Sequence, residues 1–267
     1  MFTKKNKISE IHKSAQELLE KAKKIVSTTT NQAIILNEIK QYNLIITNIP
    51  DYVHAYFARG VAHEKLEKYS EAIADYTQAI RIKPDYVDAY FNRGVVYEKL
   101  GKYKNTIDDC TEVIRLKPMD SDAYINRGNA YANLDNFIRA RDDYTQAIKL
   151  HTDFSTIYNN LGNICLNLGD YTQAVKNYTL YLEFEPWNTD AYYNRGIANQ
   201  KLEKYYDAIN DYTQIIQLDP KFGVAYYNRG ILHEKIGNVT AALEDAKVAC
   251  TFGMCELLNY LEEQSLK

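Results

Sequence analysis

A short phrase returns along this chain at a fixed spacing. It reads Tyr-Tyr-Asn-Arg-Gly at Tyr192–Gly196, and related phrases end at further glycines. Successive glycines of the set lie 34 residues apart, at Gly60, Gly94, Gly128, Gly162, Gly196 and Gly230. A strict period of this size is typical of stacked repeats that share one elongated core. The period therefore favours a repeat protein over a single large core or two independent domains.

Each 34-residue repeat has the pattern of a helical hairpin. Two apolar stripes at helical spacing are separated by a short turn, such as the one at Gly101. The repeats begin at Val53, Val87, Ser121, Ser155, Thr189 and Gly223, and prolines close most of them, at Pro84, Pro118, Pro186 and Pro220. One such hairpin cannot bury both of its apolar faces, because ordering it costs about 1.5 kcal/mol per residue. We therefore expect an all-α fold in which neighbouring hairpins stack.

The residues at fixed positions of the repeat resemble those of the tetratricopeptide repeat family. Repeat two (87–120) fits the family pattern at Tyr90, Gly94, Tyr97 and Pro118, and repeat five (189–222) at Tyr192, Gly196, Ala208, Tyr212 and Pro220. Repeat two departs from the pattern at Thr106 and Cys110. The resemblance implies an all-α, right-handed α-α superhelix, a solenoid of stacked helix-turn-helix repeats. It also implies that the first helix of each repeat lines a concave groove.

The two ends of the chain are predicted to cap the stack. The predicted parts are a degenerate N-terminal helical hairpin (residues 1–52), six repeats (residues 53–256) and a C-terminal capping helix (residues 257–267). The first hairpin is predicted from a helical pattern over residues 7–26 and from Tyr42, which stands where Tyr76 stands in repeat one. Terminal repeats need such caps because an open end exposes apolar surface. Weak self-association through these terminal helices is the alternative.

Arginine and aspartate occupy two columns of the repeat that change together. The seventh position holds Arg59, Arg93, Arg127, Arg195 and Arg229, and the twenty-third holds Asp75, Asp109, Asp143, Asp211 and Asp245. Repeat four loses both charges at once, with Leu161 and Asn177. This predicts a partly buried ion pair between the two helices of each repeat, for which the fork of arginine suits a carboxylate. A ladder of arginines that binds phosphate or carboxylate ligands is less favoured, because it would need no matching aspartates.

The sixth position of the repeat is a column of asparagines. Its members are Asn92, Asn126, Asn160, Asn194 and Asn228. An asparagine side chain both donates and accepts hydrogen bonds, so a regular row of them can pair with the main chain of an extended peptide. Within the family, such a row resembles the groove in the repeat region of O-linked N-acetylglucosamine transferase, which implies binding of a peptide backbone. The alternative is that these amides bond a neighbouring repeat or simply suit an exposed helix surface.

Other residues of the first helices are candidates for the same groove. The central repeats add amides at Asn129, Asn133, Asn159, Asn163 and Asn167. Phe91, Tyr193 and Tyr227 at the fifth position are candidate aromatic anchors. Their alternative role is packing between repeats. Asp122 and Asp190 at the second position would form an acidic rim that favours a neutral or basic peptide.

Composition and motifs argue against several other functions. A net charge of −3 provides no long-range field for nucleic acid or an anionic membrane, and no apolar run approaches the length of a membrane span. His63-Glu64 begins a sequence like a zinc-protease helix, but Glu67 stands where the second histidine is needed. No catalytic or phosphate-binding constellation is present in the sequence. We therefore expect no enzyme activity, no metal and no cofactor.

The cysteines and the N-terminus predict a cytoplasmic protein. Cys110, Cys165, Cys250 and Cys255 show no CxxC spacing and mostly occupy core positions, so they are predicted to be reduced and buried. The Lys-rich segment 1–13 lacks the apolar core of a secretory signal. The combined prediction is a cytoplasmic scaffold or adaptor that binds a protein or peptide partner. The alternatives are a self-associating structural module and a regulatory subunit that binds an enzyme in trans.

Overall fold

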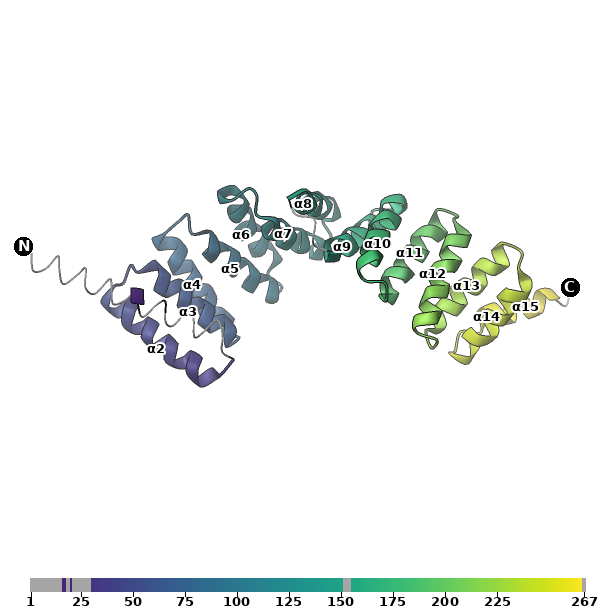
Figure 1. Ribbon diagram of the computed structural model, residues 1–267, viewed down its shortest axis with the longest axis horizontal. Coiled ribbons are helices and arrows are strands. Elements are labelled where there is room, and N and C mark those ends of the chain that lie inside the picture. Colours follow the sequence, from purple (N-terminus) through teal and green to yellow (C-terminus); the bar gives the residue numbers. More distant parts are fainter. Residues whose placement is uncertain (1–15, 18–19, 21–29, 151–154, 266–267) are drawn as a thin grey trace, which may run out of the picture. The chain divides into compact units, whose positions relative to one another are not determined.

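The computed structural model describes residues 16–17, 20, 30–150 and 155–265, and these residues form helices and turns without strands (Figure 1). The predicted helix over 7–26 lies almost wholly outside the described residues. The chain divides into two compact units, one ending at Asn136 and the other beginning at Phe137. The predicted all-α class is confirmed, and the fold is a solenoid of helix-turn-helix repeats.

The N-terminal unit holds α2 and five helices of repeats one to three. Their bounds are α2 Gln32–Asn48, α3 Val53–Lys65, α4 Tyr69–Ile82, α5 Val87–Lys99, α6 Tyr103–Leu116 and α7 Ser121–Asn133. Helices α3 and α4 pair as one hairpin, and α5 and α6 pair as the next. Helix α2 packs on α3 and buries Ile35, Ile39 and Tyr42. Among the first helices, α3 contacts α5, and α5 contacts α7, so the three share one side of the stack.

The C-terminal unit repeats this arrangement. Its helices are α8 Phe137–Leu150, α9 Ser155–Asn167, α10 Tyr171–Phe184, α11 Thr189–Lys201, α12 Tyr205–Leu218, α13 Gly223–Lys235, α14 Val239–Thr251 and α15 Glu256–Ser265. The pairs α9–α10, α11–α12 and α13–α14 are hairpins, and α9 contacts α11. The last helix, α15, lays Leu257 and Leu261 against Ala242 and Ala246 of α14. This burial removes apolar surface of the final repeat from solvent.

The tight turn inside each hairpin has one geometric cause. The fifteenth residue of every repeat has a positive φ, at Glu67, Gly101, Asp135, Gly169, Glu203 and Gly237. In repeat two, Lys102 N–H donates to the Tyr97 carbonyl at 2.8 Å, and Gly101 N–H donates to the Glu98 carbonyl at 2.8 Å. A left-handed residue that closes such bonds ends a helix abruptly. The chain can therefore start the second helix almost at once.

In repeats one, four and five, a tyrosine of the second helix packs against the glycine of the first. Tyr76, Tyr178 and Tyr212 at the twenty-fourth position are fully buried. A Cβ atom on Gly60 would lie 2.7 Å from the Tyr76 ring, and a Cβ atom on Gly162 would lie 2.7 Å from the Tyr178 ring. Glycine is therefore a packing requirement in these repeats, because only glycine lets the first helix approach the ring this closely.

The structure overturns one prediction about the cysteines. Cys250 near the end of α14 and Cys255 just before α15 form a disulfide, with their Cα atoms 4.2 Å apart. The turn between them passes through Gly253, whose φ of +89° folds the chain back. Cys110 and Cys165 are free and buried, as predicted. The cytoplasmic prediction rested on four reduced cysteines, and only two of the four are free thiols in the structure.

A thiol count tests this disulfide. Denaturing the chain without a reductant should expose two titratable thiols, those of Cys110 and Cys165. A chromogenic thiol reagent measures this, and reduction followed by desalting should raise the count to four. The native chain should react slowly, since both free thiols are buried and burial raises the pKa of the Cys165 thiol to about 11. Four thiols before reduction would contradict the disulfide.

Candidate functional site

Each arginine of the seventh position that can be placed lies between two repeats. Arg93 Nε donates to Asp109 Oδ2 at 2.9 Å, and Nη2 donates to Oδ1 at 2.7 Å. Its Nη1 donates to Thr77 Oγ1 of the preceding repeat at 2.9 Å. The Asp109 side chain is only 5% exposed. We call this arrangement of one arginine, its aspartate and the preceding hydroxyl the arginine clamp.

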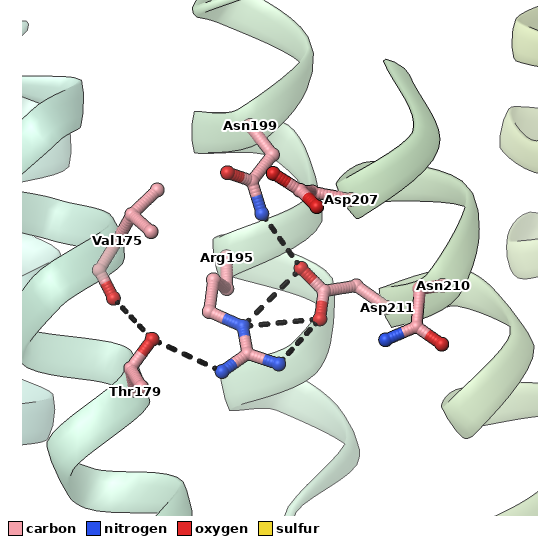
Figure 2. A pocket seen from close by; sticks show the side chains of 7 residues that line it. All are labelled: Val175, Thr179, Arg195, Asn199, Asp207, Asn210 and Asp211. Atoms are coloured by element: carbon pink, nitrogen blue, oxygen red, sulfur yellow. Dashed lines mark hydrogen bonds and ion pairs between the residues drawn. The ribbon is translucent and has the colours of Figure 1, made fainter. Parts of the chain in front are cut away.

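The clamp recurs along both units. The ion pairs are Arg59–Asp75 at 2.6 Å, Arg195–Asp211 at 2.6 Å and Arg229–Asp245 at 2.7 Å. Arg59, Arg127, Arg195 and Arg229 also reach the preceding second helix, at Asn43, Thr111, Thr179 and Thr213. Figure 2 shows the clamp of Arg195. Arg127 and Asp143 belong to different units, so their pairing stays a prediction. Guanidinium groups engaged in this way have few donors left for the phosphate or carboxylate ligands of the alternative.

The threonine of the clamp was missed in the sequence, although its column is visible there. The twenty-fifth position holds Thr77, Thr111, Thr145, Thr179 and Thr213. Thr111 and Thr213 each donate their hydroxyl to the carbonyl four residues earlier, at 2.7 Å. The hydroxyl oxygen is then left to accept from the arginine of the next repeat. Each threonine lies 16 residues before its arginine, as each aspartate lies 16 residues after it.

Burial makes the carboxylates of the clamp depend on their arginines. Removal from water raises the pKa of Asp109 and of Asp211, and the hydrogen bonds and charges of Arg93 and Arg195 offset part of this rise. Tyrosine rings at the fourth position cover the same guanidinium groups, with Arg93 5.7 Å from the Tyr90 ring centre. The clamp is therefore a structural joint between repeats.

The asparagine column lies on the side that the first helices share. Asn194 of α11 donates to Asn163 Oδ1 of α9 at 3.2 Å. The same oxygen accepts from the buried Tyr178 hydroxyl at 2.7 Å. The sixth position of repeat five is thus joined to the ninth position of repeat four, whereas the ninth position is aliphatic in repeats one, two, five and six. The surface formed by these two positions on α3, α5 and α7, and on α9, α11 and α13, is called the first-helix face of each unit.

The other asparagines of the sixth position are half-buried, as Asn194 is. Burial raises the pKa of Tyr76 and of Tyr212, and the neighbouring amides of Asn92 and Asn228 act in the opposite direction. Asn126 on α7 and Asn160 on α9 are half-buried too. Each amide of the column therefore has one side toward the protein and part of its surface toward solvent.

The remaining predicted residues have more varied surroundings. Asn129 donates to the Glu98 carboxylate at 3.4 Å. Asn133 and Asn167 are exposed, and each donates to a main-chain carbonyl of its own helix at 2.9 Å. Asn159 and Phe91 are half-buried, and Asp122 and Asp190 are exposed in the first turns of α7 and α11. A negative charge there favours the helix.

The aromatic side chains of the fifth position take part in packing. The Tyr193 ring lies 6.1 Å from the rings of both Tyr212 and Phe222. The Tyr227 hydroxyl donates to Glu256 of the last helix at 3.3 Å. These contacts support the packing alternative for Tyr193 and Tyr227, both of which are half-buried.

Two further features are absent from the described part of the chain. No helix there is long and apolar enough to cross a membrane. No three histidine, cysteine or acidic side chains there are grouped so that they could hold a metal ion.

Similar solved structures share the fold. The MamA protein is 21% identical with a TM-score of 0.61, over 65% of this chain and 94% of that one. YrrB, described as a TPR protein with an unusual peptide-binding site, is 18% identical with a TM-score of 0.64, over 71% and 97% of the two chains. A tetratricopeptide repeat protein from Parabacteroides merdae is 19% identical with a TM-score of 0.61, over 94% and 99%. No curated protein matches this chain.

Models of the repeat itself match most of the array. A TPR repeat model matches residues 65–101, and tetratricopeptide repeat models match residues 87–120, 121–154, 143–176 and 189–222. The matches at 87–120, 121–154 and 189–222 coincide with repeats two, three and five of the glycine period, whereas those at 65–101 and 143–176 start inside a repeat. They support a protein-protein interaction scaffold. This chain belongs to the tetratricopeptide repeat family.

Proposed function

We propose that this chain is a non-enzymatic scaffold that binds an extended peptide segment of a partner protein through the asparagines of its first-helix face. The observation that carries the proposal is the alignment of Asn194 with Asn163 across α9 and α11. In the described residues, the amide hydrogens of Asn163 make no hydrogen bond, whereas the Asn194 amide donates to Asn163 Oδ1 and also faces the Tyr178 hydroxyl. Asn163 therefore keeps its two donors for a ligand, and the side-chain oxygen of Asn194 can still accept a hydrogen bond.

The spacing of the asparagines suits a peptide main chain. Packed neighbouring helices lie about 8–10 Å apart, and an extended chain advances about 3.3 Å per residue. One amide per repeat can therefore meet about every third residue of an extended peptide. Because the main chain is the same at every residue, such contacts tolerate many sequences.

The charge near this face suggests which segments bind best. Asp122 and Asp190 are exposed where their first helices begin. Exposed carboxylates attract a basic peptide and repel an acidic one, and the effect weakens with salt. We therefore propose neutral or basic partner segments. YrrB, described as a TPR protein with an unusual peptide-binding site, gives this proposal a precedent in a similar fold.

A peptide library tests the proposal. Peptides selected on the full chain should lose about tenfold or more in affinity for the triple variant Asn160→Ala/Asn194→Ala/Asn228→Ala, since each lost hydrogen bond weakens binding by about 0.5–1.5 kcal/mol. The matched control is Asn105→Ala/Asn259→Ala, which removes two exposed amides on α6 and α15. Circular dichroism verifies that both variants fold.

Main-chain recognition can be checked on the ligand as well. Methylation of single peptide nitrogens removes donors without changing side chains, and it should weaken binding at about every third position. A folded triple variant that binds the selected peptides as tightly as the unmodified chain would exclude the asparagine column from the site.

A further inference from the structure

Repeat five contains a pocket that the first-helix face does not include. It has a volume of about 200 Å³ and lies between α10, α11 and α12 of the C-terminal unit (Figure 2). Val175 and Thr179 of α10 form one wall, Arg195 and Asn199 of α11 the floor, and Asp207, Asn210 and Asp211 of α12 the other wall. Two of its three elements are second helices, and no residue that lines it stands at the sixth or ninth position of a repeat.

One side chain that lines this pocket is smaller than its counterparts in most repeats. The eleventh position holds rings in most repeats, namely His63, Tyr97, Tyr131 and His233. In repeat two the Tyr97 ring lies 5.9 Å from the Arg93 guanidinium and occupies the space beside the clamp. Repeat five has Asn199 at this position, and the space beside Arg195 is left open.

Asn199 leaves an acceptor in this pocket without a donor. Its residue is 4% exposed, and its Nδ2 donates to Asp211 Oδ2 at 3.0 Å. A carboxylate only accepts, so this bond fixes which end of the amide faces Asp211. The Oδ1 atom has no hydrogen-bond partner among the described residues. A buried acceptor without a donor is unfavourable, so the pocket is suited to a group that brings N–H or O–H.

The charges of the lining favour a cation. Arg195 and Asp211 neutralise each other in the clamp, while Asp207 adds a further carboxylate and forms no ion pair within the described part of the chain. Burial raises the pKa of Asp211, and the charge of Asp207 adds to that rise. The three groups together carry one net negative charge. An anion would find no unpaired positive group, and a metal ion would find only one free carboxylate.

Among cations, an alkylammonium group suits the residues that line this pocket best. Val175 gives an apolar wall against which a methylene chain can pack, and the polar end offers Asn199 Oδ1 and the Asp207 carboxylate. An ammonium head has three donors, enough for both acceptors and for the amide oxygen of Asn210. We propose that this pocket binds the side chain of a lysine presented by a partner protein.

Titration followed by NMR on the full isotope-labelled chain tests this. The probe is Nα-acetyl-lysine N-methylamide, with sodium chloride at equal ionic strength as the reference. We expect saturable shifts confined to the signals of Thr179, Asn199 and Asn210. The Nε-acetylated form of the probe, which has no charge, should leave these signals unchanged.

Two single-residue variants that are expected to fold provide a further test of binding in this pocket. Asn199→Tyr fills the pocket with the ring that repeats two and three carry, and it should abolish the shifts. Asp207→Asn changes an exposed side chain and should weaken binding by about two- to fivefold. The proposal would be overturned if the acetylated probe or salt alone gave equal shifts, or if no saturable shift appeared. Unchanged binding by the Asp207→Asn variant would overturn it as well. If n-butylammonium binds much more tightly than the blocked lysine, the pocket would be a site for a free amine, and its assignment to a lysine of a partner protein would be wrong.

Discussion

Replacing Arg93 with leucine is expected to lower the free energy of unfolding by about 3–5 kcal/mol, because the Asp109 carboxylate then stays buried without its counter-ion. Denaturant unfolding followed by circular dichroism at neutral pH measures this. The matched control is Arg115→Leu on the neighbouring α6. Arg115 pairs with Glu112 at an exposed position, so the same substitution there should stay within about 0.5 kcal/mol.

Acid should reduce the effect of the Arg93→Leu substitution. Burial already raises the pKa of Asp109 above its usual value, and Arg93 offsets only part of that rise. Without Arg93 the folded-state pKa rises further, so the folded variant binds a proton more readily than its unfolded chain. Between the unfolded and folded pKa values, the stability of the variant therefore increases as the pH falls. A difference from the unmodified chain that stays constant from pH 7 to about 4 would contradict this account.

Repeat four shows what should happen when both partners are replaced. It carries Leu161 and Asn177, and Asn177 donates to the main-chain carbonyl of Gln173 at 2.8 Å. Adding Asp109→Asn to Arg93→Leu imitates that repeat and removes the unpaired charge. The double variant should recover about 0.5–3 kcal/mol, the usual coupling of residues in contact. Two losses that simply add would mean that the pair is not the source of the stability.

The arginine clamp also shows how far internal repeats can replace an alignment. Arg and Asp sit in one hairpin and are lost together in repeat four, so their pairing could be predicted from two columns. The contact to Thr77 joins two repeats, and no column changes in step with it. Contacts between repeats depend on how the hairpins stack, which a sequence period alone does not specify. The fold and the ion pairs inside a hairpin follow from sequence patterns, whereas the side-chain contacts between repeats do not.

The asparagines illustrate the same limit on the candidate site. The register places Asn194 on the side of α11 that the first helices share, and that much is readable from the period. Its bond to Asn163, and through that oxygen to Tyr178, is a property of the packed helices. The pocket of repeat five arises in the same way, since the change to Asn199 is visible in the column but the three helices around it are not. The disulfide was missed because the turn at Gly253, rather than a motif, brings its cysteines together.

Substitution of two equivalent glycines by alanine is expected to have opposite effects. Gly60→Ala places a Cβ 2.7 Å from the ring of the fully buried Tyr76, so the helix or the ring must move. Such overpacking is expected to destabilise the fold by about 1–3 kcal/mol. Because Tyr76 lies between two helices, its ring cannot swing away as an exposed side chain could.

Gly94→Ala is the matched control in the adjacent repeat. Repeat two has Cys110 in place of the tyrosine, and a Cβ on Gly94 would lie 3.4 Å from Asp109 Cβ and 3.6 Å from Cys110 Sγ. These are ordinary contacts, so the gain in helix propensity, up to about 1 kcal/mol, is expected to remain. Thermal unfolding of the two variants checks the pair. Equal losses would mean that glycine is needed for a reason other than the tyrosine ring. A loss only for Gly60→Ala would show that the tyrosine ring makes glycine necessary, and that packing does not require the glycine of repeat two.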